Sequence, residues 1–251
     1  MIESLPLAVT RVTTLQGDRH LTNATGFFFE RDGRLYLVTS RHVVLDEPSA
    51  HHPDRIEIEL HVNPENLGDT VQFSIPLYQE GKSVWLEGTD SAGPVDVVAL
   101  RLEKGVLPES MLYHVFTPEQ LFRKLSQVEI GAQVLIVGFP LGVYDTLHRL
   151  PVARRASIAS SFGIRFQGKG CFLTDGRLHR GTSGAPVVIR KDAPGDGRRD
   201  LPWMLLGVHS ARLDVANRDT SQDESLDLNF AWYADILLTL TQGTGAAGGQ
   251  A

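Results

Sequence analysis

The chain has 251 residues, of which 42% are hydrophobic and 22% are charged, and its formal net charge at pH 7 is −6. This composition is typical of a soluble globular protein with enough length for a substantial hydrophobic core. The negative charge argues against non-specific binding to nucleic acid, because phosphates require a basic surface. The N-terminus lacks a secretory signal and no apolar run is long enough to span a membrane. We therefore expect a cytoplasmic protein, and its one cysteine, Cys171, excludes an internal disulfide.

Short β-rich runs separated by turn residues fill the first hundred residues. The runs PLAVTRVTT, ATGFFFE and RLYLVTS come first, and Asp32-Gly33 between two of them is a strong hairpin signal. RIEIELHV then alternates apolar and polar residues, which indicates a strand with one buried face. VQFSIPLY, SVWLEG and PVDVVALRL follow. These runs predict an N-terminal six-stranded antiparallel β-barrel over residues 1–110.

The pattern changes in the middle of the chain and then returns to strands. TPEQLFRKL has Thr117 as a helix N-cap and Pro118 at the first helical position, which predicts a short helix in a linker over 111–128. AQVLIVGF, ARRASIASS, IRFQGKGCFL, APVVIR, WMLLGVHS and LDLNFAW predict a second six-stranded barrel. The apolar spacing of WYADILLTLT predicts a C-terminal helix, so this domain extends over 129–241. We expect a polar hairpin loop at 191–200 and a disordered tail at 242–251.

Three residues of this all-β double barrel suggest nucleophilic catalysis. Ser183 lies in the glycine turn GTSGAP, late in the second predicted barrel. A serine hydroxyl needs an imidazole to remove its proton, and that imidazole needs a carboxylate on its other nitrogen. His42 follows the strand RLYLVTS, and Asp96 interrupts the apolar strand PVDVVAL. Taken singly, each has a structural alternative: an ordinary surface turn, a histidine at the barrel rim and a solvated aspartate at a strand edge.

Together these motifs resemble the trypsin-like (chymotrypsin-fold) serine proteases, and most of all the bacterial HtrA/Deg protease domains. YLVTSRHVV is similar to the histidine motif of that family, VDVVALRL to its aspartate motif and LTDGRLHRGTSGAPVV to its serine segment. VLIVGFPLG and LNFAWYADIL match further conserved strand ends of the family, so the resemblance extends over roughly residues 5–240. The order His, Asp, Ser is the one expected for this fold. An α/β-hydrolase elbow does not fit, because it requires glycine where Ala185 stands.

The resemblance implies a role for each site residue and no cofactor. Ser183 would be the nucleophile of a serine endopeptidase, His42 its general base and acid, and Asp96 the group that orients the imidazole. The oxyanion hole would be formed by the backbone N–H groups of Gly181 and Ser183. The chain ends after the second barrel, so we expect no PDZ domain, and regulation by loops, oligomerisation or a partner protein.

The resemblance also implies where a protein or peptide substrate binds. The residues before the nucleophile and the strand LLGVHSAR would line the primary pocket and pair with substrate backbone. The stretch GVHS is similar to that of glutamyl endopeptidases and picornaviral proteases, which favours an acidic residue or Gln before the cut, although Leu178 replaces their usual threonine. The alternative is a structural His209. The predicted substrate-binding residues are Leu178, His179, Arg180, Val208, His209, Ser210 and Ala211.

Two hypotheses of different classes remain. The first is an active endopeptidase, and the second is a catalytically silent barrel that binds a peptide or partner protein by β-strand addition. The presence of all three reactive positions and the oxyanion glycine favours the enzyme. His51-His52 lacks a third ligand at a useful spacing, so we expect no metal site there. Cys171 is interpreted as a small buried hydrophobic residue.

Overall fold

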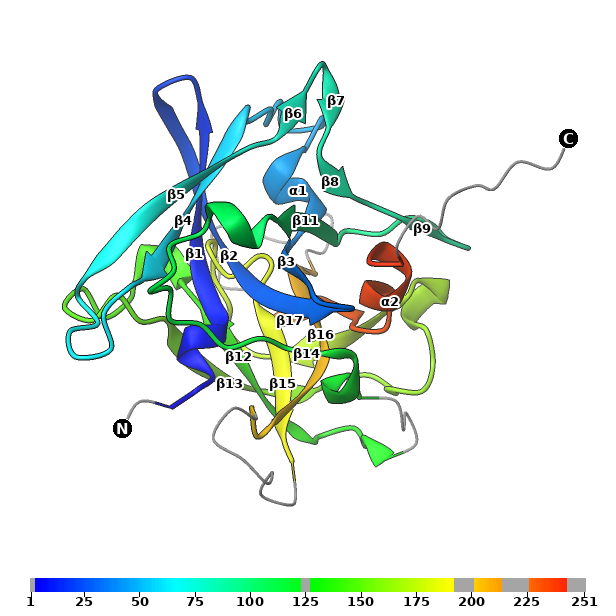
Figure 1. Cartoon of the computed structure of the whole chain (residues 1–251). Helices are drawn as coiled ribbons and strands as arrows, with labels where there is room; N and C mark the ends of the chain where they lie inside the picture. The colour runs from blue at the N-terminus through cyan, green and yellow to red at the C-terminus, as the bar shows by residue number, and fades with distance from the viewer. Residues whose placement is uncertain (1–2, 123–126, 192–200, 214–225, 243–251) are drawn as a thin grey trace, which may run out of the picture.

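A computed structural model of the chain describes residues 3–122, 127–191, 201–213 and 226–242. Most of the regular structure is β (Figure 1). Most of the predicted loop at 191–200 and of the predicted tail at 242–251 lies outside the described residues. In the first half the strands are β1 Val9–Gln16, β2 Arg19–Arg31, β3 Arg34–Thr39, β4 Arg55–His61, β5 Thr70–Pro76, β6 Tyr78–Gln79, β7 Lys82–Ser83, β8 Trp85–Leu86, β9 Thr89–Asp90, β10 Gly93–Pro94 and β11 Val98–Leu102. The second half has β12 Gln133–Gly138, β13 Val152–Ile158, β14 Cys171–Asp175, β15 Pro186–Arg190, β16 Trp203–Arg212 and β17 Leu228–Tyr233.

The second half forms the predicted six-stranded barrel. Its strands close in the order β12-β13-β14-β17-β16-β15, and each is antiparallel to its neighbours. Closure removes the unpaired strand edges that an open sheet would expose. The prediction of an all-β fold with this barrel is confirmed.

The first half is an antiparallel sheet of seven strands in the order β5-β4-β1-β2-β3-β11-β8. We predicted six strands in a closed barrel. All seven predicted runs contribute a strand, including the short β8 from SVWLEG, which pairs with β11 through Ala99 and Leu100, and no ladder among the described residues joins β8 to β5. The Asp32-Gly33 hairpin is formed as predicted: both residues have positive φ, 51° and 73°, which suits the right-handed twist of β2 and β3.

Helical structure is short. α1 spans Arg41–Val44 and α2 spans Ile236–Leu240, the predicted C-terminal helix. The predicted linker helix is only a 3₁₀ turn, Pro118–Gln120, closed by a capping box between Thr117 and Gln120. It ends there because the next residues are extended: the N–H of Phe122 donates to the Leu205 carbonyl. Further 3₁₀ turns lie at Pro6–Ala8, Lys104–Val106, Pro140–Gly142 and Phe166–Gly168.

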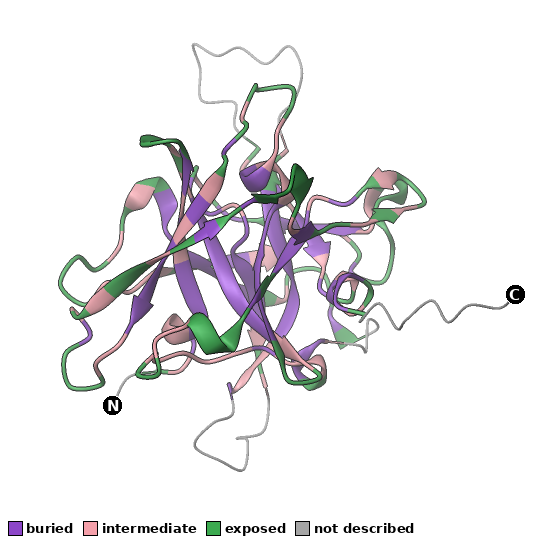
Figure 2. Ribbon diagram, turned by 45° about the horizontal axis from the view of Figure 1, so that its top comes forward, coloured by how far each residue is buried: buried purple, intermediate pink, exposed green. Residues whose placement is uncertain are grey.

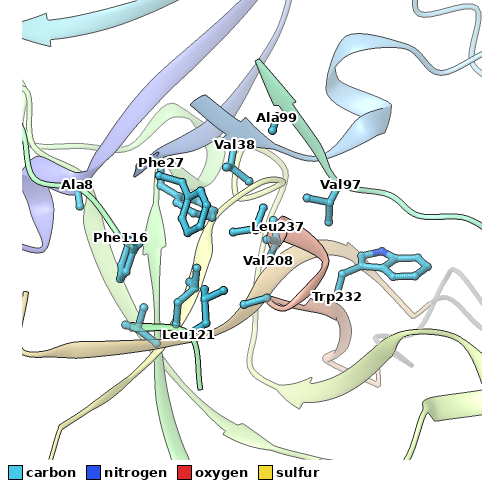
Figure 3. Close-up of a cluster of buried hydrophobic side chains, with 14 of the residues drawn as sticks. Ala8, Phe27, Val38, Val97, Ala99, Phe116, Leu121, Val208, Trp232 and Leu237 are labelled. Carbon is cyan, nitrogen blue, oxygen red and sulfur yellow. The ribbon is translucent and has the colours of Figure 1, made fainter. Parts of the chain in front are cut away.

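The largest hydrophobic cluster lies between the two halves rather than inside either one. It combines Phe27 and Val38 of the sheet with Val208 of the barrel and Leu237 of α2 (Figure 3). A second cluster fills the sheet and a third fills the barrel. Buried strands therefore run through the centre of the molecule, with exposed loops around them (Figure 2). Because the two halves share one core, the loops at their junction are held in fixed relative positions.

Candidate active site

His42 and Asp96 meet because they leave neighbouring strands at the same end. His42 lies in α1, directly after β3, and Asp96 lies just before β11, which pairs with β3 through Val98 and Thr39. The distance from His42 Nδ1 to Asp96 Oδ2 is 2.7 Å. The His42 backbone N–H donates to Asp96 Oδ1 at 2.8 Å. Both carboxylate oxygens thus orient His42 and leave its Nε2 for other partners.

The Asp96 carboxylate also accepts a hydrogen bond from Ser210 Oγ at 2.5 Å. Burial opposes ionisation of Asp96, but the hydrogen bond and charge of His42, with the Ser210 and backbone donors, lower the pKa of Asp96 below its ordinary 3.8. Burial likewise opposes protonation of His42, but Asp96, aided by Asp46, raises the pKa of His42 above 6.5. This arrangement stabilises a protonated imidazole beside an ionised carboxylate.

Ser183 lies in a tight turn that requires glycine at two positions, Gly181 and Gly184. Gly181 and Gly184 have φ of +93° and +86°, the left-handed region that favours glycine. A Cβ on Gly181 would lie 2.3 Å from the Phe139 carbonyl oxygen, and one on Gly184 would lie 2.2 Å from the Thr25 carbonyl oxygen. Ser183 Oγ donates to the Ser210 carbonyl at 3.1 Å. Ser183 and His42 line the same cleft.

The two backbone N–H groups predicted for the oxyanion hole donate to no described residue. The Arg180 carbonyl accepts from the Leu141 N–H at 2.6 Å. In a trans peptide the carbonyl and the following N–H point in opposite directions. The N–H of Gly181 is therefore directed away from Leu141, and loop 140–150 determines this orientation.

Thr25 of β2 connects the serine turn to the first half, and sequence analysis did not identify it. Its Oγ1 donates to the Gly181 carbonyl at 2.7 Å and accepts from the Phe139 N–H at 3.2 Å. Its own N–H donates to the Ser183 carbonyl at 2.9 Å. Thr25 is completely buried. In the sequence it is one more β-branched residue of a strand, so no local signal distinguishes it.

The predicted substrate-binding residues do not form one open pocket in the described part of the chain. The side chains of Leu178 and Val208 belong to hydrophobic clusters, and Ser210 is turned toward Asp96. His179 is half-buried, whereas Arg180 and Ala211 are exposed. Of these residues, only Arg180 lines the cleft beside Ser183. The predicted preference for an acidic residue or Gln stays a prediction.

His209 is buried and uncharged. Burial, reinforced by the charge of His42 and only partly offset by Asp96, lowers the pKa of His209 to about 3. Its Nδ1 is buried without a hydrogen-bond partner among the described residues. Its backbone binds the serine turn instead: the His209 carbonyl accepts from the Gly184 N–H at 2.8 Å and from Ser40 Oγ at 3.1 Å. A neutral imidazole supplies no charge to pair with an acidic substrate.

Neither the His51-His52 pair nor Cys171 forms a metal-binding or reactive site within the described ranges. His51 Nε2 lies 3.0 Å from the Val43 carbonyl oxygen, and no group of three potential metal-binding side chains occurs there. Cys171 is buried, and burial raises the pKa of its thiol to about 11, as expected for an inert residue. None of the helices in this part of the chain has the length and apolar character needed to cross a bilayer.

The fold and sequence were compared with known proteins. Among solved structures, an HtrA-type protease, AlgW with a tripeptide, has a TM-score of 0.56 and 16% identity, over 96% of this chain and 60% of that one. The active form of the Rv3671c protease of M. tuberculosis has a TM-score of 0.52 and 16% identity, over 98% and 85% of the two chains. A serine endoprotease of Yersinia pestis has a TM-score of 0.52 and 17% identity, over 94% and 62%.

The chain thus spans about 60% of the length of the HtrA-type protease, and at these identities the likeness concerns the fold. No curated protein is significantly similar to the chain in sequence. Residues 24–193, however, match the trypsin-like peptidase domain. This match covers more than half of the chain and includes His42, Asp96 and Ser183. The chain therefore belongs to the trypsin-like peptidase domain family.

Proposed function

We propose that this protein cleaves peptide bonds through an acyl-enzyme formed on Ser183, with His42 and Asp96 completing the catalytic triad. The observation that carries the proposal is the His42–Asp96 pair, in which both carboxylate oxygens hold the imidazole at 2.7 and 2.8 Å beside the cleft that contains Ser183. A serine hydroxyl is a weak nucleophile at neutral pH until an adjacent general base activates it, and the oriented imidazole of His42 can serve as that base.

In the first step Ser183 Oγ attacks the scissile carbonyl and its proton moves to His42 Nε2. The N–H groups of Gly181 and Ser183 donate to the resulting oxyanion. The tetrahedral intermediate then collapses, the C–N bond breaks and His42 gives its proton to the leaving amine. Water, activated by His42, hydrolyses the ester and restores Ser183. Before the first step the serine hydroxyl must exchange the Ser210 carbonyl for His42 Nε2 as its acceptor, which is a side-chain movement.

We expect a fluorophosphonate to label the purified chain once, because only an activated serine attacks this phosphorus centre. Intact-mass spectrometry should show one adduct on the native chain and none on Ser183→Ala. The same substitution should lower peptide hydrolysis by roughly a millionfold, because the triad residues act as a unit. Ser49→Ala is a matched control, since Ser49 lines the same cleft and should not be the labelled residue.

An adduct that persists on Ser183→Ala would contradict the proposal. A folded native chain that takes up no adduct would instead favour the silent barrel that binds peptides by strand addition. Equal thermal unfolding of the native chain and Ser183→Ala is the check that the variant remains folded.

A further inference from the structure

The cleft at Ser183 lies mainly on one side of the nucleophile. Its volume is about 690 Å³. The lining comes from the β1–β2 hairpin, the segment after α1, Leu141-Gly142 and Arg180-Gly181. His42 and Ser183 also line it. A peptide held for attack by Ser183 must extend into this space in one direction.

That direction is the leaving-group side. The strand expected to bind the other side of the substrate is β16, and neither its residues 208–211 nor Leu178 line the cleft. His42, which must deliver a proton to the leaving amine, does line it. The residues that follow the scissile bond would therefore lie in this cleft. This assignment rests on the proposed function.

The cleft carries an excess of groups that can be positive, although the chain as a whole is negative. Arg19 and Arg180 line the cleft from segments far apart in the sequence, and both are exposed. Neither forms an ion pair with any described residue, whereas Arg55 of β4, beside the β1–β2 turn, contacts three carboxylates. The titratable residues that line the cleft are Arg19, His20, His42, Asp46, His51, His52 and Arg180.

Asp46 is the only carboxylate in this lining, and it is already engaged. Its carboxylate accepts a hydrogen bond from Ser49 Oγ, and its backbone pairs with His51 in both directions, at 3.0 and 2.9 Å. Its single negative charge acts on His42 and cannot balance both arginines, which belong to other segments. Substrate carboxylates are the natural partners for guanidinium groups that have no ion pair in the cleft.

We propose that this cleft selects substrates with Asp or Glu among the first residues after the scissile bond. Arg19 and Arg180 would bind these carboxylates. An acidic residue there should raise kcat/KM about fivefold over its amide counterpart, which is the effect of about 1 kcal/mol expected from partly exposed ion pairs. The preference should weaken in 0.5 M NaCl, because salt screens exposed charges.

The experiment is cleavage of a peptide library prepared from a whole proteome, with the new N-termini sequenced by mass spectrometry. For the native chain we expect Asp and Glu to be enriched about fivefold in the first three positions after the cut. Arg19→Glu should remove most of that enrichment. Arg34→Glu should retain it, because Arg34 is an exposed arginine beside the β2–β3 turn and does not line the cleft.

Two outcomes separate this inference from the proposed function. Cleavage that depends on Ser183 but shows no acidic enrichment overturns the inference alone, whereas cleavage that survives Ser183→Ala overturns the triad. If the native chain cleaves nothing, fluorescence anisotropy on Ser183→Ala decides, with labelled peptides Ala-Glu-Glu-Ala and Ala-Gln-Gln-Ala as probes. Equal affinity for the two overturns the inference, and about fivefold tighter binding of the acidic peptide, reduced by Arg19→Glu, supports it.

Discussion

At the scale of single residues, the His42–Asp96 pair determines how the protein responds to pH. His42 acts as a base only when neutral, and its pKa lies above 6.5 because Asp96 stabilises the protonated ring. We expect kcat/KM to fall as the pH drops through this raised value, so the acid limb should have its midpoint above 6.5. A pH–rate profile with a midpoint at or below 6.5 would contradict the arrangement.

The same pair contributes to stability in a limited pH range. The raised pKa of His42 means that its contribution is complete below 6.5 and is lost as the pH rises through the folded-state value. The lowered pKa of Asp96 means that its contribution is present above 3.8 and is lost as the pH falls through its lower folded-state value. Asp96→Asn should remove the pH dependence that the pair causes and also lower kcat about 10⁴-fold, as removing the orienting carboxylate does in other triads.

Thr25 shows how a residue outside the triad can determine activity. Thr25→Val keeps the shape but removes the hydroxyl that binds the Gly181 carbonyl and the Phe139 N–H. We expect kcat to fall about tenfold, since a buried group left without its hydrogen bond costs about 1–3 kcal/mol and here the loss disturbs the turn that carries Ser183. Steady-state kinetics of Thr25→Val measure this fall in kcat. Thr25→Ser, which retains the hydroxyl, should recover most of the rate, and equal losses in both variants would show that only packing matters.

At the scale of elements, the connection between β12 and β13 contacts both halves of the molecule. We call this connection, residues 139–151, the strut. At one end the Leu141 N–H binds the Arg180 carbonyl and so orients the peptide before Gly181. At the other end Arg149 Nε lies 3.7 Å from the buried carboxylate of Glu59 on β4. Between these two ends, the guanidinium carbon of Arg11 lies over the ring of Tyr144, 4.9 Å from the ring centroid. The strut therefore links β4 to the peptide before Gly181, whose N–H we propose for the oxyanion hole.

Glu59→Gln tests this link. Glu59 also accepts from Thr70 Oγ1 at 2.9 Å and pairs with Arg11 at 3.3 Å, so neutralising it leaves two arginines without their carboxylate. We expect the free energy of unfolding to fall by about 1–3 kcal/mol, because Glu59 is buried but its partners are partly exposed. We also expect kcat to fall several-fold, because a disturbed peptide before Gly181 should cost about 1 kcal/mol of transition-state stabilisation. Urea unfolding and steady-state kinetics measure the two effects.

The matched control is Glu57→Gln, on the same strand. Glu57 pairs with Arg55, away from the connection between β12 and β13. It should change neither kcat nor stability appreciably, because exposed ion pairs contribute little. If both variants behave alike, the strut does not transmit the effect.

At the scale of the whole molecule, the two halves are joined by a shared hydrophobic core and by specific polar contacts. Asp90 of the first half accepts from the Gly170 N–H at 2.8 Å and pairs with Arg165 at 2.5 Å. The C-terminal helix returns to the first half, where Arg31 donates to the Leu238 carbonyl at 2.5 Å. The cleft that His42 and Ser183 line is thus a property of the assembled molecule.

Much of this arrangement could be predicted from sequence because its signals are local. Period-two alternation predicts strands, the glycines around Ser183 predict a tight turn, and a lone Asp96 in an apolar strand predicts a partner. The strand count of the first half and the length of the linker helix were less predictable, because both depend on hydrogen bonds to distant segments. The 3₁₀ turn at Pro118 ends where Phe122 meets Leu205.

The amino-acid sequence alone determined the β-rich class, the order of the reactive residues and the glycine turn that presents Ser183. Only the tertiary structure decided that Thr25 holds the turn that carries Ser183, that His209 is buried and neutral, and that Arg19 and Arg180 line one cleft. The physical reason is separation along the chain: Thr25 and Gly181 are 156 positions apart, and no local pattern encodes a contact that depends on how two packed halves meet.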